Sequence, residues 1–434
     1  MGSYARSGSL DNATATLTQP HAARTDVSVT STSLSGWRWA AVAAFVLFSA
    51  LNFLDRQLLA AVAPMLMTEF GLTNAGYGTV LAAFSFTYMF VAPAAGMLID
   101  RVGLTKGALF SMGTWSVVGA MTGLTTGFAS LVACRMALGA TEAAGIPCSS
   151  KGTAVYLPPR EQGFGLAVQT IGVTVGIMAA PLLVAVIAPR YGWRATFVVC
   201  GLLGLLWLPL WIVLSRKVPA HEAANVNRAA LTVRQVLADR RLWAILGANV
   251  LIMVVHSMWM NWTTVYFVQV HQLTQTEANL YFAWIPPLFA TLGGLFGAWL
   301  TLRSTSAGMT AAAARLRVCA RFAPLLLVTA LVPLMPTPLL AAVAISASFF
   351  LVMTVLNNLH VLPIDLFGPG RAALTSALLA SSYAMMQVFL SPAMGAIVDS
   401  FGFSVLCVAV SVLPALGVLL LRSACVAADA EQRA

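Results

Sequence analysis

Four ionisable residues stand inside otherwise apolar stretches of this sequence. Asp55 and Arg56 are adjacent within segment 39–64, and Arg135 and Glu142 lie within segment 129–156. An ionisable group at membrane depth costs roughly 2.5 to 3.5 kcal/mol on insertion scales, so it is usually retained for a partner, a pathway or a ligand. A carboxylate can carry a proton, and an arginine can hold a carboxylate through two parallel hydrogen bonds. Proton exchange and anion binding are therefore the chemistry that these residues suit.

The spacing of the four residues limits how they can pair. Arg135 and Glu142 are two helical turns apart, about 10.5 Å, and so share one face of a helix. Adjacent helical residues point about 100° apart, so Asp55 and Arg56 cannot simply neutralise one another. Each of these two residues therefore needs a partner from elsewhere in the chain.

Charge counting suggests how the set could act. The four groups sum to zero when all are ionised, and one added proton leaves a charge of +1 that suits a monocarboxylate. Either Asp55 or Glu142 could carry that proton. The alternative is a static network that holds the helices together, because buried ion pairs also occur without a functional role.

The elements that position these residues are predicted to be membrane-spanning helices. Of the 434 residues, 59% are hydrophobic and 9% are charged, whereas a soluble domain carries about 25% charged residues. A bilayer is spanned by about 20 mostly apolar residues. Charge-free intervals of that length predict ten helices, and the two segments that carry the four charges make twelve. The fold class expected is an all-α integral membrane protein.

The net charge of +10 reports topology and does not indicate nucleic-acid binding. Most of the 24 Lys and Arg fall in the tails and in the loops of one side, which the positive-inside rule places in the cytoplasm. We expect an inner (cytoplasmic) membrane protein with both termini cytoplasmic. The predicted parts are a disordered tail 1–36, a six-helix bundle 37–215, a cytosolic loop 216–241, a second bundle 242–422 and a tail 423–434.

Weak internal symmetry relates the two predicted bundles. Tyr191-Gly192-Trp193, after the fifth helix, recurs as Phe401-Gly402-Phe403 after the eleventh. Transporters built from such repeats bind substrate near the midplane, between the halves.

The loop between the second and third helices contains Gly96, Asp100, Arg101, Gly103 and Lys106. Glycine permits a close turn, and an acid flanked by cations can tie helix ends together. This G-x-x-x-D-R-x-G-x-x-K pattern resembles the signature loop of the major facilitator superfamily, which implies two pseudo-symmetric six-helix bundles and a gating role for the loop.

Further motifs lie in the predicted first bundle. They are Asn52-Phe-Leu-Asp55-Arg56-Gln57, Phe84 to Tyr88, Arg135 to Pro147 with Lys151, Leu157-Pro158 with Arg160-Glu161, and Gly192-Trp-Arg194. Together they resemble the anion:cation symporter family of that superfamily, and its hexuronate-type sugar-acid transporters in particular.

This resemblance implies proton-coupled import of organic carboxylates. It also implies that Asp55 and Glu142 handle protons and that Arg56, Arg135 and Tyr88 meet the substrate. In the superfamily arrangement, segments 39–64 and 129–156 both line the central cavity. We therefore expect cross-pairs such as Asp55 with Arg135 or Arg56 with Glu142.

The sequence departs from that family where hydroxyl-rich substrates would be recognised. Ala92, Val173 and Met385 stand where sugar-acid transporters often have polar residues. The expected substrate is therefore a sugar acid such as a hexuronate, or a flatter aromatic or small monocarboxylate.

The seventh predicted helix should face the first across the cavity. Its Trp259, Asn261 and Trp262 offer aromatic surface and an amide, and Gln387 in the eleventh helix could also line the site. The alternative for the tryptophans is packing against lipid or neighbouring helices.

The sequence thus predicts a secondary active transporter rather than an enzyme. The partners expected are a small organic anion, a proton and the lipid bilayer, with no cofactor, metal or nucleic acid, and the chain is expected to be monomeric. Proton-driven efflux of organic acids or drugs is the main alternative, since gradients rather than the fold set direction. A transporter-like membrane sensor is a further alternative.

Overall fold

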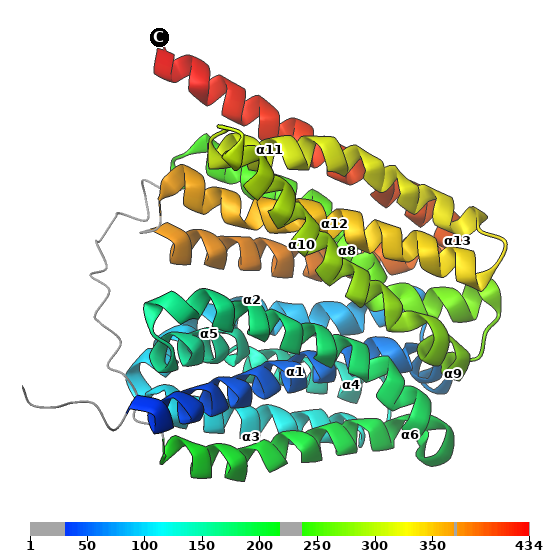
Figure 1. The fold of residues 1–434 in the computed structure, drawn as a ribbon. Coiled ribbons are helices and arrows are strands. Elements are labelled where there is room, and N and C mark those ends of the chain that lie inside the picture. The colour runs from blue at the N-terminus through cyan, green and yellow to red at the C-terminus, as the bar shows by residue number, and fades with distance from the viewer. Residues whose placement is uncertain (1–30, 218–236, 369–370, 434) are drawn as a thin grey trace, which may run out of the picture.

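The computed structural model describes residues 31–217, 237–368 and 371–433. The predicted tail 1–36 and the central loop therefore lie mostly outside the described residues. Two groups of helices, one from each half of the chain, lie one above the other in Figure 1. The first group contains α1 (Ser31–Phe70), α2 (Asn74–Val102), α3 (Leu104–Thr122), α4 (Phe128–Glu142), α5 (Gly145–Tyr156) and α6 (Pro159–Ser215).

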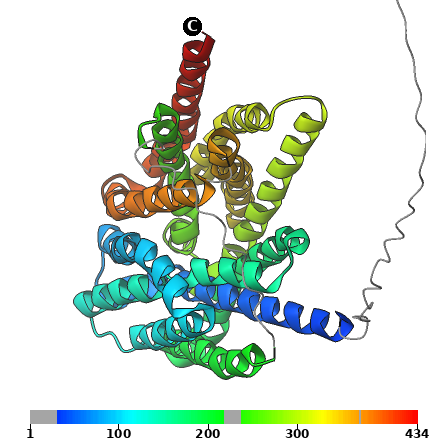
Figure 2. The ribbon, with the colours of Figure 1, turned by 90° about the vertical axis from the view of Figure 1, so that its left-hand side faces the viewer.

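The second group follows the same plan with more local irregularity. It contains α8 (Arg240–His271), α9 (Gln275–Glu277), the π-helical turn η1 (Ala278–Ala283), α10 (Ile285–Ser306), α11 (Ala311–Phe322), the 3-10 helix η2 (Ala323–Leu334), α12 (Pro338–Phe367) and α13 (Ala372–Arg433). In Figure 2 the two groups lie on either side of a common boundary.

Twelve membrane crossings can be followed through these elements. Eight continuous helices in the described residues are long and apolar enough to span a bilayer. Two of them, α6 and α13, each contain two crossings joined at a bend, and α3 and the α4–α5 pair supply the remaining two. The predicted fold class is confirmed.

The two bends lie at the corners that the sequence repeat predicted. Gly192 in α6 has φ 76° and ψ 163°, and Gly402 in α13 has φ 76° and ψ 176°. L residues rarely adopt such a positive φ, whereas glycine does so freely. Each half therefore turns from its fifth to its sixth crossing at an equivalent glycine.

Glycines also bring α6 against α1. A Cβ on Gly172 would lie 2.6 Å from the Val46 side chain, and one on Gly176 would overlap the backbone carbonyl of Ala50. Helices in a membrane associate through such small residues, because hydrophobic burial gives little drive there. This contact fixes α1, the helix that carries Asp55 and Arg56.

Large aromatic side chains fill the rest of the first bundle near α1. The Phe48 ring lies 4.7 Å from that of Trp115, and the Phe45 ring lies 4.7 Å from that of Trp211. The Trp207 indole donates a 2.8 Å hydrogen bond to the Ala44 carbonyl, so its one polar group is satisfied inside the bundle.

The two halves meet most closely where α2 packs against α13 (Figures 1 and 2). A Cβ on Gly78 of α2 would overlap the Ser391 carbonyl, and one on Gly395 of α13 would overlap the Asn74 carbonyl. The two backbones therefore touch directly along this boundary.

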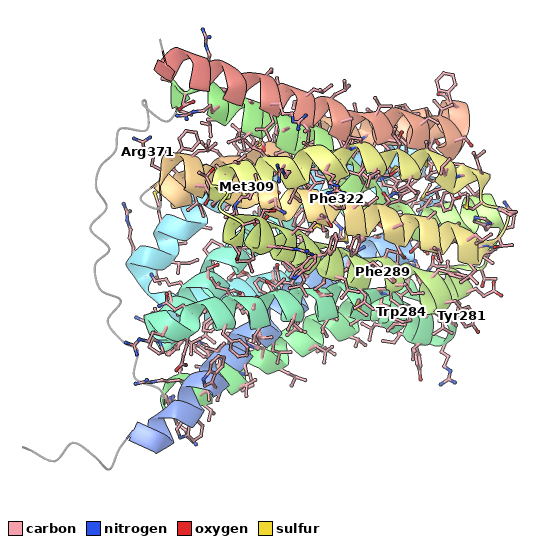
Figure 3. All side chains as sticks on the ribbon, turned by 45° about the horizontal axis from the view of Figure 1, so that its top comes forward. Tyr281, Trp284, Phe289, Met309, Phe322 and Arg371 are labelled. Carbon is pink, nitrogen blue, oxygen red and sulfur yellow. The ribbon has the colours of Figure 1, made fainter. Side chains whose placement is uncertain are left out.

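The surface of η1 and α10 shows how the chain meets lipid. Tyr281, Trp284 and Phe289 follow one another along this segment in Figure 3, and the Tyr281 side chain is 58% exposed. Tyrosine and tryptophan concentrate at membrane–water interfaces because their rings are apolar with one polar group. Tyr281 and Trp284 are placed to form such an interfacial belt.

We predict that Gly176→Ala lowers stability, because the new methyl group overlaps the Ala50 carbonyl. Overpacking of this kind costs about 1–3 kcal/mol. Gly163→Ala is the matched control in the same helix, because Gly163 has no atom within 4 Å of its Cβ position. Thermal unfolding of the purified protein should show a lower midpoint for Gly176→Ala only, and equal midpoints would contradict the packing described.

Candidate functional site

The Arg56 side chain joins α1 to α4. Its Nε donates a 2.6 Å hydrogen bond to Oε2 of Glu142, whose side chain is fully buried. Rings of Phe53, Phe84 and Tyr88 surround the guanidinium, with centroids 5.3, 5.0 and 4.8 Å from its Cζ. The expected Arg56–Glu142 cross-pair is therefore present, and the ring faces add cation–π attraction for the guanidinium.

Asp55 points in a different direction, into the first bundle. The residue is 2% exposed, and a Cβ on Gly119 of α3 would lie 2.9 Å from its Oδ2. Its carboxyl group interacts electrostatically with Arg135 and with the Glu142 carboxyl, and the Cys200 thiol of α6 lies beside it. Neither Asp55 oxygen receives a hydrogen bond from the residues that the structure describes.

Arg135 is a buried cation with open donors. The residue is 2% exposed and its Cζ lies 5.8 Å from the ring centroid of Phe197. Its Nε and Nη2 have no hydrogen-bond partner among the described residues, although Asp55 attracts it electrostatically. The predicted Asp55–Arg135 pair is thus an electrostatic neighbour pair without a direct hydrogen bond.

The four charges form one cluster inside the first bundle. The carboxyl groups of Asp55 and Glu142 influence one another electrostatically, and each is attracted by one of the two arginines. In such an apolar setting two adjacent carboxylates disfavour double ionisation. The arrangement can therefore hold a proton on the carboxyl pair and an anion at the arginines.

In the second half, Ser257 and Asn261 of α8 and Gln387 and Ser391 of α13 form a set of hydrogen-bonded polar side chains. Gln387 of α13 accepts hydrogen bonds from Ser257 of α8 and, at 3.0 Å, from Ser391. Asn261 donates a 2.9 Å hydrogen bond to the Ser257 carbonyl. Two of the residues expected to line the site, Asn261 and Gln387, are therefore connected through Ser257.

Tyr383 lies beside this polar set, next to Gln387, and was not predicted from the sequence as a site residue. It interacts with Gln387 and, across the boundary between the halves, with Arg56 and Tyr88. Tyr383 precedes Gln387 by four residues and so lies on the same helix face, which is the signal that could have found it. Met385, two residues along, points to the other side of α13 and is 47% exposed.

The two tryptophans of α8 are buried between the halves. Trp262 packs edge-on against Tyr77, with centroids 5.1 Å apart, and Trp259 packs against Tyr266 at 5.6 Å. Trp259 also lines a small cavity of about 20 Å³ that Gln57 of α1 faces. In this conformation the tryptophans act as packing surface beside the site.

The predicted gating loop lies at the junction of α2 and α3. Gly103 has φ 92°, and its N–H caps α2 by donating to the Ile99 carbonyl. Arg101 and Lys106 are exposed there, and Gly96 lies in the last turns of α2. The side chain of Asp100 lies outside the described residues.

This architecture defines a class of protein. Twelve membrane crossings in the described residues form two bundles, and Arg56 and Tyr88 of the first bundle face Tyr383 of the second across their boundary, an arrangement typical of membrane transporters.

Comparison with known proteins gives the family. The Major Facilitator Superfamily profile matches residues 45–378. The hexuronate transporter of Escherichia coli (strain K12) is 26% identical over 408 residues, which cover 89% of this chain and 94% of that protein. The galacturonate transporter of Dickeya chrysanthemi is 28% identical over 232 residues, covering 49% of this chain and 66% of that protein.

A solved structure has the same fold. It is a bacterial homolog of the human lysosomal transporter Spinster in an inward-facing and occupied conformation, with a TM-score of 0.77, 18% sequence identity and coverage of 89% of this chain and 97% of that chain. The chain belongs to the Major Facilitator Superfamily and is a transporter, not an enzyme.

We predict that Glu142→Gln destabilises the protein by about 3 kcal/mol, because it leaves the Arg56 charge without its partner. The double variant Arg56→Gln with Glu142→Gln removes both charges together and should recover most of that loss. Thermal unfolding of the single and double variants measures the coupling. Additive losses would show that the ion pair contributes nothing.

Proposed function

We propose that this protein imports an organic carboxylate together with protons, by alternating access across a bacterial inner membrane, with both termini in the cytoplasm. The observation that carries the proposal is the 2.6 Å Arg56–Glu142 ion pair, whose carboxylate also interacts with Asp55. The pair engages one donor of Arg56, its Nε, with a group that a proton can neutralise, while Nη2 of Arg56 has no partner among the described residues.

Protonation couples to binding through this pair. When Glu142 takes up a proton, its attraction for Arg56 falls, and the guanidinium becomes free to hold a substrate carboxylate through two hydrogen bonds. Arg135 offers further buried donors near the same carboxyl pair. Asp55 then acts as the internal partner that stabilises Arg135 and shares the coupling proton with Glu142.

The substrate class follows from what surrounds Arg56. Relatives named as hexuronate and galacturonate transporters support a sugar acid. Tyr383 places a hydroxyl across the boundary from the guanidinium, with the Gln387 amide beside that hydroxyl, which suits a hydroxylated substrate body. The rings of Phe53, Phe84 and Tyr88 around Arg56 suit a flatter carboxylate equally, so both classes belong in the test.

The first test is uptake in proteoliposomes. An inward proton gradient should accumulate radiolabelled galacturonate, or an aromatic monocarboxylate, above its equilibrium level. Glu142→Gln should reduce proton-driven accumulation of the substrate by about 100-fold or more, because the glutamine cannot release a proton. Substrate exchange should persist.

Arg135→Ala serves as the binding control and should abolish both accumulation and exchange. Arg317→Ala, which removes an exposed cation of α11, should leave both unchanged. Accumulation by Glu142→Gln equal to that of the parent would overturn the coupling role. Proton-driven extrusion with no import would establish efflux in its place.

The alternating-access part of the proposal is supported by the contacts that join the halves. Asp399 of α13 accepts hydrogen bonds from the backbone N–H groups of Asn74 and Ala75, both at 2.9 Å, and from the Asn74 side chain at 2.8 Å. These N–H groups begin α2, where the helix dipole favours a negative charge. A carboxylate of one half thus caps a helix of the other half.

Other hydrogen bonds join the halves in the same region. Met65 N–H donates to the Gln275 side chain at 3.0 Å, and the Asn279 amide donates to the Ala61 carbonyl at 2.8 Å. We infer that this end, which is periplasmic in the proposed topology, is closed here and that these contacts must break when the site opens to it.

We predict that Asp399→Asn favours opening at this end. Loss of the charge weakens the cap of α2 by about 1 kcal/mol, or about fivefold in the ratio of open to closed states. Spin labels on α2 and α13 near Asn74 and Asp399 would report the distance distribution between them.

Glu277→Gln is the matched control. Glu277 is a carboxylate at the same end of the second half, but it caps Thr274 within its own half, with a 2.9 Å hydrogen bond from the Thr274 N–H. The control should leave the distance distribution unchanged. An equal shift in both variants would contradict the role given to Asp399.

A further inference from the structure

A large groove lies on the first bundle, away from the charged cluster. It has a volume of about 870 Å³ and is lined by α2 over 91–102, by α3 over 106–114 and by residues 140–144 at the end of α4. This volume is in the range of pockets that bury most of a small organic ligand. The groove contains none of the residues assigned above to protons or substrate.

The groove exists because small residues line the place where α2 and α3 separate. The two helices are joined tightly at Gly103, and Ala94, Gly107, Ala140 and Ala144 leave the space beyond it unfilled. Larger apolar side chains form the rim, and Met97, Leu98 and Phe110 are 60%, 53% and 67% exposed. This rim belongs to the surface that meets lipid chains.

The uncharged polar groups inside the groove are already satisfied. Ser111 donates to the Thr141 carbonyl at 3.0 Å, Thr114 donates to the Phe110 carbonyl at 2.8 Å, and Thr141 donates to the Ala137 carbonyl at 3.0 Å. The interior therefore presents an apolar surface, which suits hydrocarbon rather than a sugar acid.

Charge is confined to one end of the groove. Among the residues whose side chains the structure describes, the ionisable ones that line the groove are Arg101 and Lys106, which are exposed and lie at the α2–α3 junction. No described carboxylate lines it. The apolar part of the groove suits hydrocarbon chains, and the two cations at its end suit an anionic headgroup.

We propose that the groove binds an anionic phospholipid of the surrounding bilayer. Its acyl chain lies between α2 and α3, and its phosphate contacts Arg101 and Lys106. Basic pockets between membrane helices on the cytoplasmic side bind anionic headgroups in this way. The leaflet assignment rests on the proposed topology, whereas binding itself does not.

The lipid would bridge the junction expected to gate transport. One acyl chain contacts both helices on either side of Gly103, and one phosphate contacts the last turn of α2 and the first turn of α3. Lipid binding should therefore stabilise the α2–α3 hairpin.

The experiment uses the purified full-length chain in neutral detergent, titrated with phosphatidylglycerol or with phosphatidylcholine of the same acyl chains. Native mass spectrometry counts retained lipid, and thermal unfolding follows stabilisation. Phosphatidylglycerol should be retained selectively. Arg101→Gln with Lys106→Gln should weaken its retention by roughly 25-fold, because each cation near an anionic headgroup contributes about fivefold.

The control variants distinguish the contribution of the lipid headgroup to retention from that of its acyl chain. Arg317→Gln with Arg321→Gln removes two exposed cations of α11, outside the groove, and should retain phosphatidylglycerol as the parent does. Ala94→Phe keeps both cations but fills the apolar part, and it should also weaken retention.

Three results would overturn the proposal. These are equal retention of phosphatidylglycerol and phosphatidylcholine by the parent, equal losses in the α2–α3 and α11 double variants, and full displacement by inorganic phosphate alone. None of them bears on carboxylate uptake, so failure here is distinguishable from failure of the transport proposal.

Discussion

The ion pair between Arg56 and Glu142 is the interaction around which the first bundle is organised. A fully buried carboxylate needs compensation, and Arg56 supplies it directly, while Arg135 and Asp55 extend the charge balance deeper into the helices. Glycines of neighbouring helices position the residues of this charged cluster. Gly172 and Gly176 hold α1 against α6, and Gly119 leaves space on α3 for the Asp55 carboxylate.

The adjacent residues Asp55 and Arg56 have separate tasks because the helix turns between them. Arg56 faces α2 and the second half, where Tyr88 and Tyr383 lie. Asp55 faces α3, α4 and α6, away from that boundary. A change in the charge of Glu142 alters the electrostatic environment of Arg56 and of Asp55, since Glu142 interacts with each of them.

Much of the fold was predictable because its signals are local. Apolar length predicted the crossings, and the Gly192 and Gly402 corners predicted the repeat that the backbone angles confirm. The Arg56–Glu142 pairing was expected because the superfamily arrangement brings the helices of these two residues to one cavity. Tyr383 shares a helix face with Gln387, but its place across from Arg56 depends on which face of α13 meets α2. The burial of Trp259 and Trp262 likewise depends on how tightly the two halves close, which no stretch of sequence encodes alone.

The helix α2 connects two features that were described separately. It has 29 residues, a length of about 43 Å. Its first N–H groups are held by Asp399 of the other half, and its last turn carries Arg101 at the lipid groove. Pro93 interrupts it between these ends, where a helix can bend because an internal hydrogen bond is missing. α2 therefore consists of two helical parts that can bend at Pro93. A movement of its first turn at one membrane surface can in this way change the position of its last turn at the other surface.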